Sequence, residues 1–371
     1  MGSCHREGTF ETRGANIPDG QNFNRKSMSR LALESSAVQY PLVRHAVDGG
    51  WQFVPEAEAL ARRRGEEGMF FYEELEKALL RLNPGVITPD NVASVISTIE
   101  AVPPTMEGNR QLLDWVRGRK TVFVPTEKRS RNVTIIDFEN PLEPGRNVFQ
   151  VTIEWSFRKH WKKGNRPDVV FLINGVPVAL VECKNPKLRN AMEKALVQLR
   201  RYELETPEMM VSPQVFNITH LIEYFYGVTW SYERKGLFNW KQELKALPSV
   251  HYAADPPPPP PVYGDNPSDD LSIAAEAPTP PPSYGHQVKS FFDRRRFLNL
   301  LGEWIVFFVK DDELKKTVLA QHQSRAAAKV VERCLDPDKT RGLIWHTQGS
   351  GKTFTMITAA RLLLEGKQPP A

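Results

Sequence analysis

The stretch from Arg166 to Lys184 constrains the fold of this chain more than any other segment. Two short apolar runs flank the pair Asn174-Gly175. An Asn-Gly pair between apolar, β-branched runs is typical of a two-residue hairpin turn, because both residues tolerate a positive φ. The second run, Val178 to Val181, is apolar on both faces, as in a strand that is central in its sheet. The sequence therefore predicts an antiparallel hairpin inside a sheet.

Charged residues stand at the open end of this hairpin. Alternation along the second strand places Val178, Glu182 and Lys184 on one face. A strict two-residue turn would pair Asp168 with Val181 and would direct Asp168 to the other face. Either a β-bulge or fraying of the strand end is needed to bring Asp168 beside Glu182.

These residue types suit hydrolysis of a phosphodiester. Two carboxylates, Asp168 and Glu182, can hold Mg²⁺ through oxygen, and the ammonium of Lys184 can steady a hydroxide or the phosphate charge. An ordinary hairpin with charged residues at its solvated ends is the alternative interpretation. Downstream, Gln198 and Tyr202 share one face of a helix expected from about 190 to 203.

A second phosphate-directed motif lies at 347–353. Gly349, Ser350, Gly351, Lys352 and Thr353 follow an apolar run, 342–346, and precede an apolar helix, 354–364. A buried strand, a glycine-rich loop and a helix form a P-loop, in which the lysine meets the β- and γ-phosphates and the threonine meets Mg²⁺. The sequence thus predicts nucleotide binding, and a glycine-rich turn without a ligand is the alternative.

Composition sets limits on the function. A net charge of +5 over 371 residues permits nucleic-acid binding without arguing strongly for it. Three scattered cysteines show neither zinc spacing nor a disulfide pattern, which favours a reducing compartment such as the cytoplasm. Neither a signal peptide nor a run of transmembrane length is present, so no membrane partner is expected.

Periodicity predicts the remaining elements. Helices are expected around 38–46 and over 69–82, 89–100, 291–309 and 321–334, and strands over 121–124, 132–136 and 147–154 in an antiparallel meander. Proline clusters at 256–261 and 278–282 predict an extended linker or surface insertion, with a ligand for a proline-binding module as the alternative. The predicted division is a flexible tail (1–28), a mixed α/β domain with function at one edge of its sheet (29–250), a linker or insertion (251–287) and the start of a second domain (288–371).

The pattern formed by Asp168, Glu182, Lys184, Gln198 and Tyr202 resembles the PD-(D/E)xK nuclease superfamily. The sequences of 166–178 and of 34–42 are similar to the N-terminal nuclease region of the R subunit of type I restriction enzymes, and the glycine loop is similar to the start of its superfamily 2 motor. The resemblance covers roughly 30–245 and 288–365.

That resemblance implies a mixed sheet flanked by helices, followed by the beginning of a RecA-like motor domain. It implies that Asp168 and Glu182 bind Mg²⁺, that Lys184 activates water, and that Gln198 and Tyr202 support the site. Such folds often add an acid from the first helix, for which Glu34 is the best candidate, with a surface charge as the alternative. Gln323 resembles the glutamine that such motors place against adenine, although any helix can carry a glutamine.

For the activity, the resemblance implies cleavage within double-stranded DNA, coupled in the full protein to ATP-dependent translocation. The implied partners are the methyltransferase (M) and specificity (S) subunits. Because few residues follow Thr353, this chain alone is expected not to hydrolyse ATP productively. The alternatives are an ATP-dependent repair nuclease or helicase–nuclease of another system, and a catalytically silent DNA-binding module.

Overall fold

The structure, a computed structural model, describes residues 35–159, 163–188, 190–241, 282–338 and 341–366. The predicted tail, 1–28, lies outside the described residues, as does most of the predicted proline-rich linker, 251–287. The end of that segment is helical rather than extended, because 282–287 form the first part of helix α10 (Pro282–Phe291).

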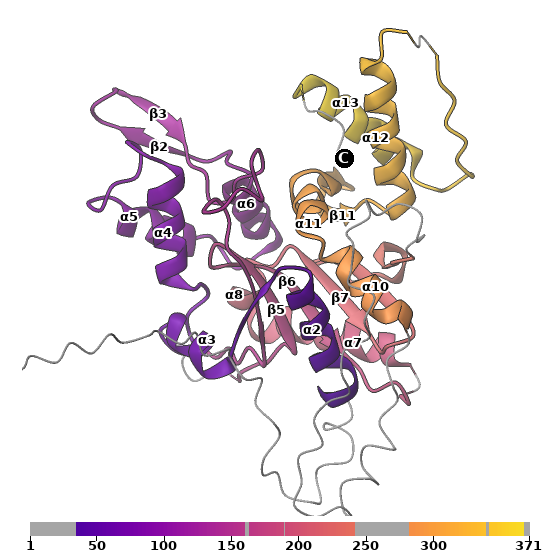
Figure 1. Cartoon of the computed structure of the whole chain (residues 1–371), viewed down its shortest axis with the longest axis horizontal. Coiled ribbons are helices and arrows are strands. Elements are labelled where there is room, and N and C mark those ends of the chain that lie inside the picture. The colour runs from indigo at the N-terminus through magenta and orange to yellow at the C-terminus, as the bar shows by residue number, and fades with distance from the viewer. Residues whose placement is uncertain (1–34, 160–162, 189, 242–281, 339–340, 367–371) are drawn as a thin grey trace, which may run out of the picture.

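The chain forms runs of helices and runs of strands (Figure 1). The helices of the part before the proline-rich segment are η1 (Ser35–Gln39), α2 (Tyr40–Asp48), α3 (Glu56–Arg62), α4 (Tyr72–Leu82), α5 (Val92–Glu100), α6 (Met106–Val116), α7 (Ala191–Glu205), α8 (Pro207–Met210) and η2 (Arg234–Gly236). After that segment come α10, α11 (Arg294–Asn299), η4 (Leu300–Trp304), α12 (Gln321–Leu335) and α13 (Lys352–Leu364).

A seven-stranded sheet organises the molecule, in the order β1-β4-β5-β6-β7-β8-β9. Its strands are β1 (Gln52–Val54), β4 (Phe149–Ile153), β5 (Val169–Ile173), β6 (Val176–Cys183), β7 (Val215–Thr219), β8 (Tyr224–Val228) and β9 (Phe238–Asn239). The sheet is mixed, because β1 pairs with β4 and β6 with β7 in parallel, while the other neighbours are antiparallel. The fold-class prediction of a mixed sheet flanked by helices is therefore confirmed. The expected antiparallel meander is confirmed for β4, β5 and β6 and was wrong for 121–124 and 132–136, which do not join this sheet.

Two helical layers cover the sheet. On one face, Val169 and Phe171 of β5 pack in a cluster that includes residues of α2, α4, α5, α6 and α10. On the other face, Val170 and Leu172 pack with residues of α7 and α8. Strand β6 is the middle strand and is buried along its whole length, as predicted for a central strand.

The hairpin of β5 and β6 turns as predicted and also contains a bulge. Asn174 and Gly175 have φ of 50° and 78°, the values of a two-residue turn with positive φ at both positions. Ile173 pairs with Val176, but the register shifts between Phe171 and Leu172, so that Val178 is an extra residue on β6. Val178 consequently packs on the face opposite Leu180, and its predicted place beside Glu182 was wrong.

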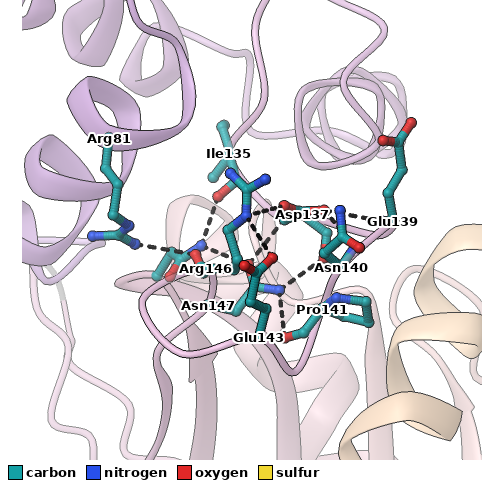
Figure 2. A network of polar contacts seen from close by, with 10 residues as sticks. Arg81, Ile135, Asp137, Glu139, Asn140, Pro141, Glu143, Arg146 and Asn147 are labelled. Carbon is teal, nitrogen blue, oxygen red and sulfur yellow. Dashed lines mark hydrogen bonds and ion pairs between the residues drawn. The ribbon is translucent and has the colours of Figure 1, made fainter.

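The turn is buried and tied to a polar network in the loop before β4. The side chain of Asn174 donates to the carbonyl of Ile135 (2.8 Å) and to Asn147 Oδ1 (2.9 Å). Figure 2 shows the surrounding loop, where Asn147 donates to the carbonyl of Asp137 (2.8 Å) and Arg146 pairs with Asp137 (3.2 Å). This network anchors the turn, and with it the register of the hairpin that carries the charged residues.

The run 132–136 was wrongly predicted as a strand. Strand β3 covers Arg129–Asn132 and pairs only with β2 (Thr121–Val124), in a separate two-stranded sheet. The residues after it are buried but irregular, because side-chain amides bind their backbone: Asn83 accepts from the N–H of Thr134 (2.7 Å) and donates to its carbonyl (2.8 Å). Buried backbone groups need a partner, and here an asparagine replaces the neighbouring strand.

The predicted helix over 291–309 was also wrong at its end. Helix α10 ends at Phe291, α11 and η4 run from Arg294 to Trp304, and the chain then forms strand β10 (Ile305–Lys310), paired with β11 (Glu313–Val318). The turn between them uses Asp311 and Asp312 with φ of 54° and 58°, a positive-φ turn without glycine. An apolar run of this length does not distinguish helix from strand by periodicity alone.

Residues after the proline-rich segment share a core with the sheet. Tyr284, Phe291 and Leu319 belong to the same buried cluster as Val169 and Phe171. The domain boundaries proposed from sequence stay predictions, and the packing shows that 282–319 lie against the sheet. In Figure 1, α12 and α13 lie side by side beyond this core. Among the described residues, none of the helices combines the length and the apolarity that crossing a bilayer requires.

Candidate functional site

The candidate site lies where β5 begins and β6 ends, in the middle of the sheet. The bulge sets the pairing of Val169 with Val181, and continuing this register brings Asp168 opposite Glu182. The backbone after β6 is fixed in turn, because the N–H of Lys184 donates to the carbonyl of Thr219 at the end of β7 (2.9 Å). Of the two ways considered for turning Asp168 toward Glu182, the structure has the bulge.

The structure brings the three predicted charged residues together. Lys184 Nζ lies 3.1 Å from Glu182 Oε2 and 3.8 Å from Asp168 Oδ2, so both carboxylates adjoin one ammonium. Asp168 Oδ2 also accepts the N–H of Cys183 at 2.7 Å. Lys184 Nζ donates to the carbonyl of Cys183 at 2.9 Å. The carboxylates are therefore on the same side of the sheet and close together.

The charged side chains of the site differ in how deeply they are buried. Glu182 is fully buried and Lys184 nearly so, whereas the side chain of Asp168 keeps about a fifth of its surface (21%) in contact with solvent. A buried carboxylate is costly unless a cation or a hydrogen-bond donor compensates it. Glu182 thus depends on Lys184, and a charged pair in the middle of a core indicates a role beyond solubility.

The donor set fits a hard divalent cation. Two carboxylates and the carbonyl of Cys183 face the same region, and Mg²⁺ is typically bound by one or two carboxylates together with waters. Among the residues that the structure describes, no three His, Cys, Asp or Glu side chains are grouped so as to hold a metal. An ion at this place would accordingly rest on Asp168 and Glu182, with water completing its shell.

Helix α7 contributes the two polar residues predicted to support the site. Gln198 Nε2 donates to the hydroxyl of Tyr202 (2.5 Å), and that hydroxyl donates to the carbonyl of Arg166 (3.0 Å). Burial, reinforced by the charge of Glu182, raises the pKa of the Tyr202 hydroxyl, so it stays protonated and remains a donor. Tyr202 therefore holds the backbone just before Asp168.

A basic cleft of about 600 Å³ opens from this site. Asp168, Lys184, Gln198 and Tyr202 are among the residues that line it. The other charged residues of the lining are basic, with Glu66 as the acidic exception: Arg158, Lys163, Arg166, Lys194 and Arg201. Lys194 is four residues before Gln198 on α7, so both point to the cleft. Such a concentration of cations beside the carboxylates suits a polyanion backbone.

Sequence reasoning missed part of this site. Gln39 donates to Glu154 Oε1 (2.8 Å) and to the carbonyl of Asp168 (2.7 Å), and Arg166 Nε pairs with Glu154 Oε2 (2.8 Å). Gln39 lies in the stretch 34–42 that resembles the R subunit, but neither it nor Glu154 was assigned a role, because their roles depend on contacts 115 residues apart in sequence. Arg166 lies two residues before Asp168, at the start of the segment 166–184, so its part in the site could have been predicted from the sequence. The predicted Glu34 lies outside the described residues.

The glycine loop has a different environment. The predicted helix begins at Lys352, and Gly349 and Gly351 both have φ of 75°. Lys352 Nζ donates to the carbonyl of Thr347 (2.9 Å), so the loop closes on its own lysine. Thr353 is exposed in the first turn of α13. These contacts do not test nucleotide binding, so the nucleotide site at this loop stays a prediction.

The strand expected before this loop was wrong. Residues 341–347 are irregular, and Leu343 and Trp345 are 86% and 85% exposed. A strand exists only where a neighbour supplies hydrogen bonds, and none of the described strands pairs with this run.

Gln323 contacts the loop from helix α12. Its side-chain amide donates to the carbonyls of Ser350 (2.9 Å) and Gly351 (3.2 Å), while its oxygen accepts the N–H of Ala320 (2.7 Å). The structure therefore brings Gln323 to the loop, and contact with adenine stays a prediction.

Comparisons with known proteins match two families to two different parts of the chain. The family described as the type I restriction enzyme R protein N terminus matches residues 32–232. The family described as the SWI2/SNF2 ATPase matches residues 322–371. The first match covers more than half of the chain and contains Asp168, Glu182 and Lys184.

Curated relatives carry related names. The type I restriction enzyme HindI endonuclease subunit of Haemophilus influenzae is 26% identical over 334 residues, which are 85% of this chain and 28% of the relative. A Methanocaldococcus jannaschii protein, provisionally named the MjaIXP endonuclease subunit of a type I restriction enzyme, is 24% identical over 312 residues, 79% of this chain and 27% of the relative. The chain thus spans about a quarter of the length of these relatives.

Proposed function

This chain belongs to the family of the type I restriction enzyme R protein N terminus, and from that premise we propose that it carries the DNA-cleaving site of a restriction subunit. The names of its relatives support a restriction role. The reaction is Mg²⁺-dependent hydrolysis of a phosphodiester within double-stranded DNA, on a fold of the PD-(D/E)xK type. The observation that carries the proposal is the placement of two carboxylates on one ammonium, with Asp168 and Lys184 lining a basic cleft and Glu182 buried beside Lys184.

Each residue of the site has a proposed role. Asp168 and Glu182 would hold Mg²⁺, which supplies Lewis-acid stabilisation of the phosphoryl charge and a more acidic water when bound. The ammonium of Lys184 adjoins the buried Glu182 and is placed to orient that water or to stabilise the developing negative charge. Tyr202, oriented by Gln198, fixes the backbone that precedes Asp168.

The cleft supports DNA as the substrate. Lys163, Lys194 and Arg201 are exposed residues that line the cleft together with Asp168, and Lys163 and Arg201 also pair with Glu205. Contacts to phosphates position a duplex without reading its sequence. In the full protein, recognition would then come from the S subunit, with the M subunit as a further partner.

The glycine loop supports an additional proposal for the full-length protein. The SWI2/SNF2 match and the contact of Gln323 with the loop support a motor that binds ATP through Gly349, Ser350, Gly351, Lys352 and Thr353. ATP-dependent translocation along DNA, coupled to cleavage, is the function we propose for that motor.

Nicking of supercoiled plasmid by the chain in Mg²⁺ tests the nuclease proposal. We expect Asp168→Ala and Lys184→Ala each to slow nicking by about a hundredfold or more, and chelation of the metal to stop it. Lys77→Ala is the matched control, because Lys77 is an exposed lysine on α4, paired with Glu73. Equal nicking by all four proteins would remove the assignment of the site.

A further inference from the structure

The short segment 166–168, which leads into β5, is held from three sides. The hydroxyl of Tyr202 donates to the carbonyl of Arg166 at 3.0 Å. The carbonyl of Asp168 accepts the backbone N–H of Glu154 at 2.9 Å and the side-chain amide of Gln39 at 2.7 Å. The contacts come from α7, from the end of β4 and from η1, three parts of the chain that are distant in sequence.

Gln39 is the buried link between these parts. It is 2% exposed, and its amide nitrogen donates both to the Asp168 carbonyl and to Glu154 Oε1 (2.8 Å). An amide NH₂ group has two hydrogens, so both are used. An apolar residue at this place would leave Glu154 Oε1 without its donor and the Asp168 carbonyl with one donor instead of two. A part-buried acceptor that loses its donor costs free energy beyond the bond itself.

Glu154 has an unusual backbone conformation at the same point. Its φ is 53°, in the left-handed region that residues other than glycine and asparagine rarely adopt. Such a conformation persists only where surrounding contacts enforce it, and it is frequent at functional sites. Both carboxylate oxygens are occupied, Oε1 by Gln39 and Oε2 by Arg166 Nε at 2.8 Å. Glu154 is thus engaged with protein groups and is no metal ligand in this arrangement.

We propose that Gln39 and Glu154 are positioning residues for the metal site, acting through Asp168 and Arg166. They fix the Asp168 carbonyl, so that its carboxylate stays on the Cys183 N–H and beside Lys184. Through the same carboxylate of Glu154 they hold the guanidinium of Arg166, a half-exposed side chain of the cleft. The inference rests on the proposed function, because it assigns these two residues to the same site.

Binding of Mn²⁺ to the whole chain, followed by the electron paramagnetic resonance of the free ion, tests this role separately from cleavage. Asp168→Ala sets the scale for loss of a ligand. We expect Gln39→Leu to weaken Mn²⁺ binding by about tenfold, the usual effect of removing a group that orients a metal ligand. Gln52→Leu is the matched control, because Gln52 is an exposed glutamine on β1.

Glu154→Gly separates positioning from stability. Glycine tolerates the positive φ, so this variant should keep or raise the melting temperature while it weakens Mn²⁺ binding by a similar factor. Combining Gln39→Leu with Glu154→Gly should weaken binding little more than either change alone, because the two residues act as one unit.

Three results would overturn the inference. Unchanged Mn²⁺ affinity in folded Gln39→Leu and Glu154→Gly, with binding lost in Asp168→Ala, would limit both residues to a structural role. A loss in Glu154→Gly as large as that in Asp168→Ala would make Glu154 a ligand. Mn²⁺ affinity that is unchanged in Asp168→Ala would show that the ion does not bind at the proposed site. Failure of the proposed function has a different signature: normal, Asp168-dependent Mn²⁺ binding without plasmid nicking in Mg²⁺.

Discussion

The strand ends that carry Asp168, Glu182 and Lys184 lie within a seven-stranded sheet, whereas the loop that carries Lys352 follows an exposed, irregular segment. Both regions were recognised from short motifs of similar length. In the first, the sheet register and contacts from distant helices fix every polar group. In the second, the contacts found among the described residues come from Gln323 and His322 of α12, from Lys352 of the loop itself and from the helix that follows. A motif thus specifies which polar groups are present, while contacts with the rest of the fold decide how firmly those groups are positioned.

Two glycines give the largest expected contrast between the regions. Gly175 has φ +78°, and a Cβ added there would lie 2.3 Å from the carbonyl oxygen of Phe71. Gly349 has φ +75°, and nothing lies within 4 Å of its added Cβ. We expect Gly175→Ala to lower the free energy of unfolding by about 3 kcal/mol or more, and Gly349→Ala by about 1 kcal/mol, from the backbone alone.

Urea unfolding followed by tryptophan fluorescence measures both changes. Equal losses for Gly175→Ala and Gly349→Ala would contradict the view that the hairpin turn is enclosed and the glycine loop is open.

Two lysines give the next contrast. Lys316 of β11 is buried, and its ammonium contacts Asn109 Oδ1 (2.6 Å), Thr229 Oγ1 (3.1 Å) and two oxygens of Gln214 (2.8 and 3.1 Å). Lys316→Met would leave these acceptors buried without their donor and should cost about 3 kcal/mol. Lys352→Met in the glycine loop should change the free energy of unfolding by less than about 0.5 kcal/mol.

The same urea titration applies to this pair. A loss below 1 kcal/mol for Lys316→Met, on the order of a single exposed hydrogen bond, would mean that 305–318 is not locked to the sheet.

A tyrosine hydroxyl near the hairpin turn should give a pH-dependent effect. Tyr72 donates to Glu100, and burial together with this carboxylate raises the pKa of the hydroxyl to about 12. Because the folded pKa exceeds the unfolded value of 10.0, the contribution is full below pH 10 and is lost as the pH rises through 12. Tyr72→Phe should therefore cost about 1 kcal/mol at pH 8, and the difference from the wild type should shrink above pH 10. A difference that grows with pH over this window would have the wrong sign.

The exposed run before the glycine loop should give the smallest effect. Trp345 is 85% exposed, and Leu343 is 86% exposed. Trp345→Ala should alter the free energy of unfolding by less than about 0.5 kcal/mol, whereas burial in a sheet would make the same change cost about 3 kcal/mol or more. A loss of the second size would show that this run packs as a buried strand in solution.

Local signals predicted part of this molecule well. The Asn174-Gly175 turn, the central position of β6 and the helices α7, α12 and α13 follow from residue types and periodicity within a few positions of one another. The grouping of Asp168, Glu182 and Lys184 was predicted from their chemistry and from the hairpin, on the condition that a bulge or a frayed strand end turns Asp168 toward Glu182.

What sequence did not predict depends on long-range partners. The bulge at Val178, beside Pro177, decides the face of Asp168, and the sequence left it as one of two alternatives. Asn83 and Asn174 satisfy backbone groups where a strand was expected, and no local pattern announces this. Gln39 and Glu154 join the site only through the fold. These features depend on tertiary contacts, which at particular residues outweigh the local structure that periodicity predicts.

Diffraction from a crystal soaked in Mn²⁺, with data collected at the manganese absorption edge, tests the central claim most directly. The account predicts one anomalous peak between the carboxylates of Asp168 and Glu182, within coordination distance of both, and none in a crystal of Asp168→Ala. A peak held by other residues, or strong binding elsewhere with none at these two carboxylates, would contradict it.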